Sequence, residues 1–184
     1  MTRIDQLIAS YAAHITMPLP SGLAASQRVW FALYPASDDR RLSCRLDEFE
    51  ILTKQAGHPW IRIDLRGKFA EWLKSVDAEE RADWFKNPND VDLYAKTEWK
   101  HELSELFRSH VARAEAPERT VFALTGVMEL FDYLHVSDVL EELEHIIPGY
   151  LLVFFPGERE GNQYRFLDAR LGWNYLAVPI LSQQ

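Results

Sequence analysis

The sequence predicts an α/β domain, a three-layer sandwich in which helices cover both faces of a mainly parallel β-sheet. Short, unbroken runs of apolar residues recur along the chain, as expected for strands that are buried on both faces. Between them lie longer segments whose apolar residues recur at helical spacing. The chain has 184 residues, of which 47% are hydrophobic, so it can bury one large core. We therefore predict a single domain over residues 1–184.

The first predicted element is an amphipathic helix within residues 1–20, which we expect to dock on the rest of the domain. Apolar side chains recur at helical spacing from Ile4 to Ile15. Pro18 and Pro20 then end the pattern, because proline cannot continue a helix.

A strand, a helix and a second strand are predicted next. The run RVWFALYP, residues 28–35, is typical of a buried strand, and PWIRIDL, residues 59–65, is the second one. The helical pattern between them ends at Gly57, where a left-handed cap favours glycine. Such a βαβ unit makes its strands parallel, and we expect them to be neighbours or near neighbours in the sheet.

The middle of the chain, residues 68–117, is predicted to be a helical insertion or cap beside the sheet. Asp77 and Glu80 have the spacing of a capping box, which marks the start of a helix. A longer helix is expected from Asp90 until Pro117.

Two further buried strands and a helix follow. The strands are TVFALT, residues 120–125, and YLLVFF, residues 150–155. Between them an amphipathic helix over 138–147 is expected to be capped by Asp138 and Glu141.

The C-terminal part of the chain is predicted to add two short strands. Pro156 and Gly157 are expected to end the strand before them, and a turn is expected at Leu171 and Gly172. Pro179 cannot donate a backbone hydrogen bond, so the last strand should lie at an edge of the sheet or near a strand end.

Composition excludes several classes of protein. The net charge of −8 argues against binding nucleic acid over the whole surface, since neutralised phosphates supply most non-specific affinity. Cys44, the only cysteine, can form neither an internal disulfide nor a zinc cluster, and we expect it to be partly buried and unreactive. Without a membrane-spanning run or a secretory signal, the sequence predicts a cytoplasmic protein.

Arginine is more frequent than lysine, with 14 arginines and 6 lysines. Because arginine forms bidentate pairs, this excess favours ion pairs or contacts with protein partners. Sequence-tolerant DNA contact through the clustered Arg40, Arg41 and Arg45 remains an alternative.

Ligands of parallel sheets bind beyond the carboxyl ends of the strands, so the candidate site residues are those that follow the predicted strands. They are Asp64, Thr125, Gly126, Pro156, Gly157, Glu158, Arg159 and Asn162. Asp64 is placed where an acid can hold a ribose hydroxyl or a magnesium ion, and the loop that contains Glu158 could supply further ligands. The alternative is that Asp64 pairs with Arg62 or Arg66 and that residues 156–162 form a polar turn.

No sequence signature of catalysis is present. The segment PASDDRR, residues 35–41, has neither the glycine nor the lysine of a phosphate-binding loop, and Asp38 and Asp39 would repel a polyphosphate. The sheet is therefore expected to be Rossmann-like, or degenerate P-loop-like, without a phosphate-binding loop. A zinc-protease HExxH motif and a hydrolase GxSxG motif are also missing. We assign no catalytic residue, no metal ligand and no cofactor, and we do not expect an enzyme.

The C-terminal half of the sequence resembles a known family. The segments LTGVMELFDYLHVSDVLEELE, GYLLVFFPGEREGNQYRFLD and GWNYLAVPI are similar to the BrxB family, a small core component of bacterial BREX bacteriophage-exclusion systems. The earlier strands VWFALYP and PWIRIDL fit the same pattern, so the resemblance covers residues 28–180. It brings no catalytic motif to this chain.

The resemblance implies a role in antiviral defence through protein–protein interaction. It implies a non-catalytic adaptor or scaffold of a BREX complex that binds a PglZ-type alkaline-phosphatase-like protein and an AAA-type ATPase, with the adenine methyltransferase as a third candidate partner. A nucleotide- or metal-dependent enzyme that uses the strand-end loops at Asp64 and Glu158 is the alternative function.

Overall fold

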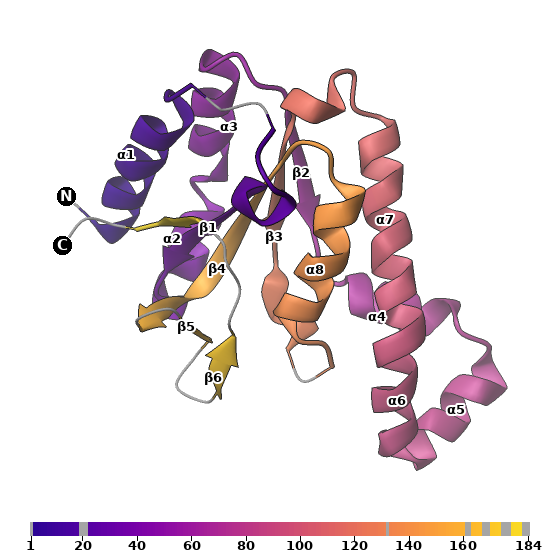
Figure 1. Ribbon diagram of the computed structural model, residues 1–184. Coiled ribbons are helices and arrows are strands. Elements are labelled where there is room, and N and C mark those ends of the chain that lie inside the picture. The colour runs from indigo at the N-terminus through magenta and orange to yellow at the C-terminus, as the bar shows by residue number, and fades with distance from the viewer. Residues whose placement is uncertain are drawn as a thin grey trace.

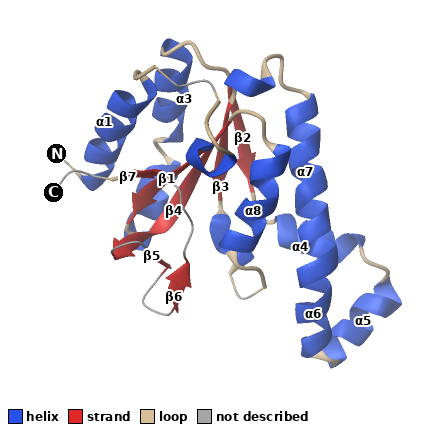
Figure 2. Ribbon diagram, viewed as in Figure 1, coloured by secondary structure: helices blue, strands red, loops and turns tan. Residues whose placement is uncertain are grey.

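Five parallel strands form the centre of the structure, and helices lie on both faces of this sheet (Figures 1 and 2). The computed structural model describes residues 2–18, 22–131, 133–160, 163–166, 170–173 and 178–181. The strands are β1 (Val29–Tyr34), β2 (Trp60–Asp64), β3 (Val121–Thr125), β4 (Tyr150–Glu160) and β7 (Val178–Ile180), in the order β2-β3-β4-β1-β7. The predicted three-layer α/β sandwich with a mainly parallel sheet is therefore confirmed.

Helices connect these strands. They are α1 (Arg3–Ile15), α2 (Asp39–Ser43), α3 (Leu46–Gln55), α4 (Lys68–Ser75), α5 (Ala78–Lys86), α6 (Pro88–Tyr94), α7 (Lys100–Ala112) and α8 (Val136–Ile146). Asp77 caps α5 by accepting hydrogen bonds from the amides of Glu79 and Glu80. The expected cap of α8 is wrong: this helix begins at Val136, so Asp138 lies within its first turn, where a negative charge suits the helix dipole.

Each face of the sheet has its own hydrophobic core. In β1, Val29, Phe31 and Leu33 point to the core shared with α4 to α8. The alternate residues Trp30, Ala32 and Tyr34 point to the core shared with α1, α2 and α3. All six residues of β1 are buried, which is why this strand shows no polar alternation in the sequence.

The strand order corrects one expectation. Strands β1 and β2 are parallel, but β3 and β4 lie between them, so they are not neighbours. Strand β2 is an edge strand whose Arg62 is exposed, whereas β1 is central. The order also differs from that of the Rossmann fold, in which the first strand lies beside the second.

Helices α4 to α7 occupy residues 68–112, and α5 and α6 project from the rest of the molecule at the lower right of Figure 1. Helices α6 and α7 are joined without a break by a π-helical segment, η3 (Ala95–Trp99). Aromatic rings hold this region together: Trp72 lies 5.8 Å from Trp84 and 5.7 Å from Trp99 between ring centroids, and Trp84 stacks on Tyr94 at 4.5 Å.

The end of β4 also differs from the expectation. Strand β4 does not stop at Pro156 and Gly157 but continues to Glu160, where it pairs with the antiparallel strand β5 (Gln163–Phe166). Pro156 is the last residue of β4 paired with β1, and Gly157 is the first paired with β5. The Pro-Gly pair therefore marks a change of partner strand and not the end of a strand.

The predicted turn at Leu171 and Gly172 is wrong, because both residues lie in β6 (Arg170–Trp173), which pairs with β5. After β4, the described residues thus form three strands, whereas the sequence predicts two. The last one, β7, lies at the edge of the sheet, as Pro179 predicts. Within the described ranges, no helix has both the length and the apolar character of a membrane span.

Candidate functional site

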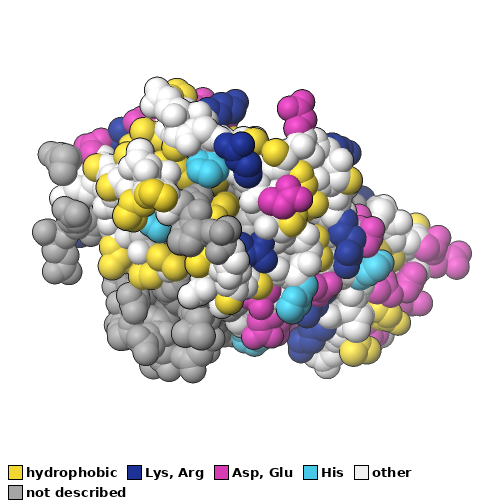
Figure 3. Space-filling model, turned by 45° about the horizontal axis from the view of Figure 1, so that its top comes forward, with side chains coloured by type: hydrophobic (Ala, Val, Ile, Leu, Met, Phe, Trp, Pro, Cys, Tyr) yellow, Lys and Arg dark blue, Asp and Glu magenta, His cyan; other side chains and the backbone are white. Residues whose placement is uncertain are grey.

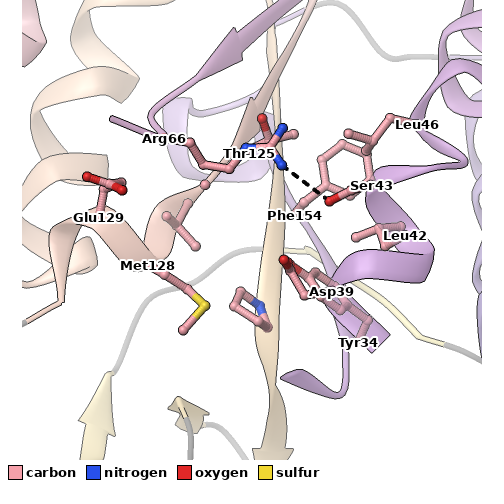
Figure 4. Close-up of a pocket in the computed structure, with 13 residues that line it drawn as sticks. Tyr34, Asp39, Leu42, Ser43, Leu46, Arg66, Thr125, Met128, Glu129 and Phe154 are labelled. Atoms are coloured by element: carbon pink, nitrogen blue, oxygen red, sulfur yellow. Dashed lines mark hydrogen bonds between the residues drawn. The ribbon is translucent and has the colours of Figure 1, made fainter. Parts of the chain in front are cut away.

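The carboxyl ends of the parallel strands meet at one edge of the sheet and enclose a crevice of about 80 Å³ (Figure 4). Strands β1, β3 and β4, helices α2 and α3, and the loops after β2 and β3 all contribute to its lining. The lining residues are Tyr34, Asp39, Leu42, Ser43, Leu46, Arg66, Thr125, Gly126, Val127, Met128, Glu129, Phe154 and Pro156. A crevice is therefore present at the carboxyl ends of the strands, which is where parallel sheets usually bind ligands.

Asp64 ends β2 and is paired with Arg66. The Nε atom of Arg66 lies 3.0 Å from each oxygen of the Asp64 carboxylate, and its Nη2 atom lies 2.6 Å from Oδ2. The backbone amide of Arg66 also donates to Oδ1, at 3.1 Å. On the other side, Arg62 lies 3.7 Å from Oδ2. The pairing that the sequence left open is therefore present, with Arg66 as the principal partner.

This pairing decides what the Asp64 carboxylate can do. Partial burial works to raise the pKa of Asp64, but the hydrogen bonds from Arg66 outweigh it and hold the pKa below its usual value. The carboxylate is charged, but its charge is balanced and its lone pairs are occupied. To bind a metal ion, it would have to give up the guanidinium.

Gly126, just after β3, is required by this arrangement. Its φ of 73° lies in the left-handed region, which residues with a Cβ rarely adopt. A Cβ at this position would also lie 2.8 Å from the amide nitrogen of Arg66 and 3.0 Å from Oδ1 of Asp64. The glycine thus allows the loop after β3 to lie directly against the ion pair.

Thr125 contributes an unusual polar group. It is 5% exposed, and its buried hydroxyl has no partner with full hydrogen-bond geometry among the described residues, although it lies close enough to the Asp64 carboxylate to help lower the pKa of Asp64. It pairs in register with Asp64 on the neighbouring strand and lines the crevice. A buried hydroxyl without a partner costs free energy, so this atom is available to a water or a small polar ligand.

Three further polar side chains of the crevice, Tyr34, Asp39 and Ser43, have partners within the protein. Tyr34 donates a hydrogen bond of 2.6 Å to Asp39, and burial raises the pKa of the Tyr34 phenol. The Nη1 atom of Arg66 points to the hydroxyl of Ser43, 3.5 Å away (Figure 4). Because Asp39 and Glu129 line the crevice and Arg66 is already paired, the electrostatics disfavour a polyphosphate.

The predicted candidates divide into two groups. Thr125, Gly126 and Pro156 line the crevice, and Asp64 lies beside it against Gly126. Gly157, next along β4, is buried. The side chains of Glu158 and Arg159, and all of Asn162, lie outside the described residues, so a metal site shared by Asp64 and Glu158 remains a prediction. Among the described side chains, no group of three potential metal ligands comes together.

Sequence reasoning missed Tyr34 and Ser43 as lining residues. Tyr34 could have been found, because it is the last residue of a predicted strand and carries a polar atom. Ser43 lies on α2, a helix of five residues whose direction is set by the turn after β1. The sequence pattern contains no signal for that direction.

The arginine cluster considered for DNA contact is largely neutralised. Arg45 forms ion pairs with Asp5 and Glu48, and Arg41 pairs with Asp38 at 3.0 Å. Only Arg40 of the three makes no ion pair with a described residue. Cys44 lies beside them and is exposed, so the expectation that it is partly buried is wrong. It follows Ser43, the last residue of α2, and caps the solvent-facing end of that short helix.

A second candidate surface lies on the projecting helices α5 and α6. Phe85 on α5 is 66% exposed and Leu93 on α6 is 61% exposed. The residues next to them, Trp84 and Tyr94, stack on each other and fix the two helices together. Two large apolar side chains are thus presented to solvent on a firmly packed helical hairpin.

No family model, curated protein or solved structure matches the chain.

Proposed function

We propose that this protein is a non-catalytic adaptor of a cytoplasmic BREX phage-defence complex. The observation that carries the proposal is the exposure of Phe85 and Leu93 on the hairpin of α5 and α6. They are the two most exposed of the large apolar side chains that the structure describes, and aromatic side chains are enriched at protein interfaces. The stack of Trp84 on Tyr94 holds the two helices together, so little backbone entropy is lost on binding.

The sequence resemblance supports the same role. The segments that resemble the BrxB family include β1, β2, β4 and the strands that follow, and the resemblance implies an assembly with several large partners. The partners we propose are the PglZ-type protein and the AAA-type ATPase, with the methyltransferase as a third. The occupied carboxylate of Asp64 and the glycine-free segment after β1 favour an adaptor over nucleotide or metal chemistry.

Co-purification tests the proposal. The tagged full-length chain is expressed with the other genes of its operon, and retained proteins are identified by mass spectrometry. We expect the wild type to retain the PglZ-type protein or the ATPase, and F85S/L93S to lose most of it. The control is Ile51→Ser, which changes a side chain of α3 that is 53% exposed. If the wild type retains no BREX protein, or if F85S/L93S retains as much as I51S, the proposal is wrong.

A second candidate function, ligand binding in the crevice, is favoured by the unpartnered hydroxyl of Thr125. Calorimetric titration with ATP, GTP and Mg²⁺ distinguishes it from the adaptor role. The adaptor role predicts no heat of binding for any of them. Heat that the wild type gives and Thr125→Val lacks would instead identify the crevice as a nucleotide or metal site.

A further inference from the structure

A groove runs between α4 and α5 on one side and η3 and α7 on the other. Its volume is about 520 Å³. The lining residues are Trp72, Ser75, Val76, Glu80, Thr97, Glu98, His101 and Glu102. Trp72 and Val76 are its apolar members, and Trp72 is fixed by its ring contacts with Trp84 and Trp99. The groove therefore has a firm apolar floor.

The rim of the groove is acidic. Glu80, Glu98 and Glu102 are exposed, and none of them pairs with a described residue. Among the basic residues nearby, Arg81 donates to the backbone carbonyls of Leu73, Lys74 and Val76, and Lys86 pairs with Asp83. Lys74 and Lys96 form no ion pair with a described residue, but neither of them lines the groove. Figure 3 shows acidic side chains gathered on the projecting corner at the right, together with hydrophobic ones. His101, exposed in the groove, is the other titratable group there.

We propose that this groove binds a basic amphipathic segment of a partner protein. Lysine or arginine head groups of that segment pair with the three glutamates, while their alkyl stems and an apolar neighbour pack on Trp72 and Val76. The inference rests on the adaptor function and adds the chemistry of the partner. The same charges argue against the other occupants, because a second copy of this surface, a nucleic acid or an anionic membrane would each be repelled.

A peptide-binding experiment tests the charge complementarity directly. The probe is a fluorescein-labelled helical peptide of leucine and lysine, compared with one of leucine and glutamate. E80Q/E98Q/E102Q removes the three rim charges. E115Q/E118Q/E141Q is the matched control, because it removes three exposed, unpaired charges elsewhere and leaves the same net charge. We expect the dissociation constant of the lysine peptide to rise about tenfold in the groove variant and to stay near the wild-type value in the control.

The outcomes separate this inference from the adaptor function. Equal weakening of the two triple variants would show that only net charge matters, and would overturn the inference. So would a wild-type dimer, seen by light scattering, that E80Q/E98Q/E102Q dissociates, because the occupant would then be a second copy. If the wild type retains BREX proteins and E80Q/E98Q/E102Q retains them equally at low and high salt, the groove inference fails while the adaptor function stands. If the wild type retains none, the adaptor function fails, whatever the peptides show.

Discussion

Arg66 forms a multidentate ion pair with the carboxylate of Asp64 at the end of β2. Its Nε atom lies 3.0 Å from both carboxylate oxygens, and its Nη2 atom lies 2.6 Å from one of them. An acid at the end of a parallel strand is where many proteins of this class hold a ribose or a metal. Here the neighbouring arginine occupies the carboxylate. The carboxylate at this strand end is thus bound by the protein's own side chain.

Replacing Asp64 with asparagine should lower the free energy of unfolding by about 0.5 to 1 kcal/mol at pH 7, since the pair is partly exposed. Because the folded pKa of Asp64 is lowered, its contribution is full above its ordinary pKa of 3.8 and is lost as the pH falls through the folded value. Urea unfolding at pH 7 and pH 3 should show the difference from the wild type shrinking in acid. Asp92→Asn, at an exposed site without an ion pair to any described residue, is the control and should behave as the wild type. If the unfolding free energies of D64N and the wild type differ as much at pH 3 as at pH 7, the negative charge of Asp64 is not the source of the stabilisation.

Gly126→Ala should cost more than an ordinary glycine substitution. At a positive φ the alanine itself costs about 1–2 kcal/mol, and the collision of its Cβ with Arg66 and Asp64 adds about 1–3 kcal/mol. Gly57→Ala is the matched control, because Gly57 has a φ of 86° with nothing within 4 Å of the added Cβ. Chemical unfolding of both variants measures the difference. Equal losses would mean that the loop after β3 moves away without cost.

The strands could be predicted because their burial is complete. In β1 and β3 every residue is buried, so an unbroken apolar run was a reliable signal. The strand order could not be predicted, since nothing in the sequence pattern states which strands pair. In retrospect, the polar residues Arg62 and Asp64 in β2 were a signal of its edge position.

The candidate site could be predicted in part for a similar reason. Residues at strand ends, such as Thr125 and Pro156, follow from the rule that parallel strands end at the same edge. Residues such as Ser43 depend on how a short helix is oriented, which tertiary packing decides. The prediction that β4 ends at Pro156 and Gly157 was wrong for another reason. A proline and a glycine indicate an irregularity in the backbone, but they do not show whether the strand ends there or continues with a different partner strand.

Thr125→Val should raise the free energy of unfolding by about 1 kcal/mol, because it removes a buried hydroxyl without a partner and keeps the shape of the side chain. Thr53→Val is the opposite case and serves as control. The hydroxyl of Thr53 is buried, donates to the carbonyl of Phe49 at 2.7 Å and contacts the hydroxyl of Tyr11 at 2.6 Å, so its loss should destabilise the protein. Thermal unfolding compares the two. A loss of stability in T125V would show that the hydroxyl has a partner, either the carboxylate of Asp64 or a bound water or ligand.

Part of the excess of arginine over lysine has a structural explanation, because three arginines donate to backbone carbonyls at the ends of helices. Arg28 donates from Nη1 to the carbonyls of Ile147 at 2.9 Å, Pro148, and Gly149 at 3.0 Å, just after α8. Arg81 does the same after α4, and Arg119 donates to the carbonyl of Gly57 after α3. The last carbonyls of a helix have no partner within it, and a guanidinium can serve several of them at once.

Arg28→Met should therefore lower the free energy of unfolding by about 1–3 kcal/mol, since it keeps the apolar stem and removes charged hydrogen bonds to three carbonyls. Arg28→Lys should recover only part of this loss, because its ammonium nitrogen lies one bond closer to the backbone than Nη1, the atom from which Arg28 reaches all three carbonyls. Arg40→Met, at an exposed arginine without an ion pair to any described residue, is the control and should change stability little. Urea unfolding measures all three variants, with hydrogen exchange in the last turn of α8 as a local readout. If R28K is as stable as the wild type, a single positive charge is sufficient, and the guanidinium geometry does not explain why arginine is used at this helix end.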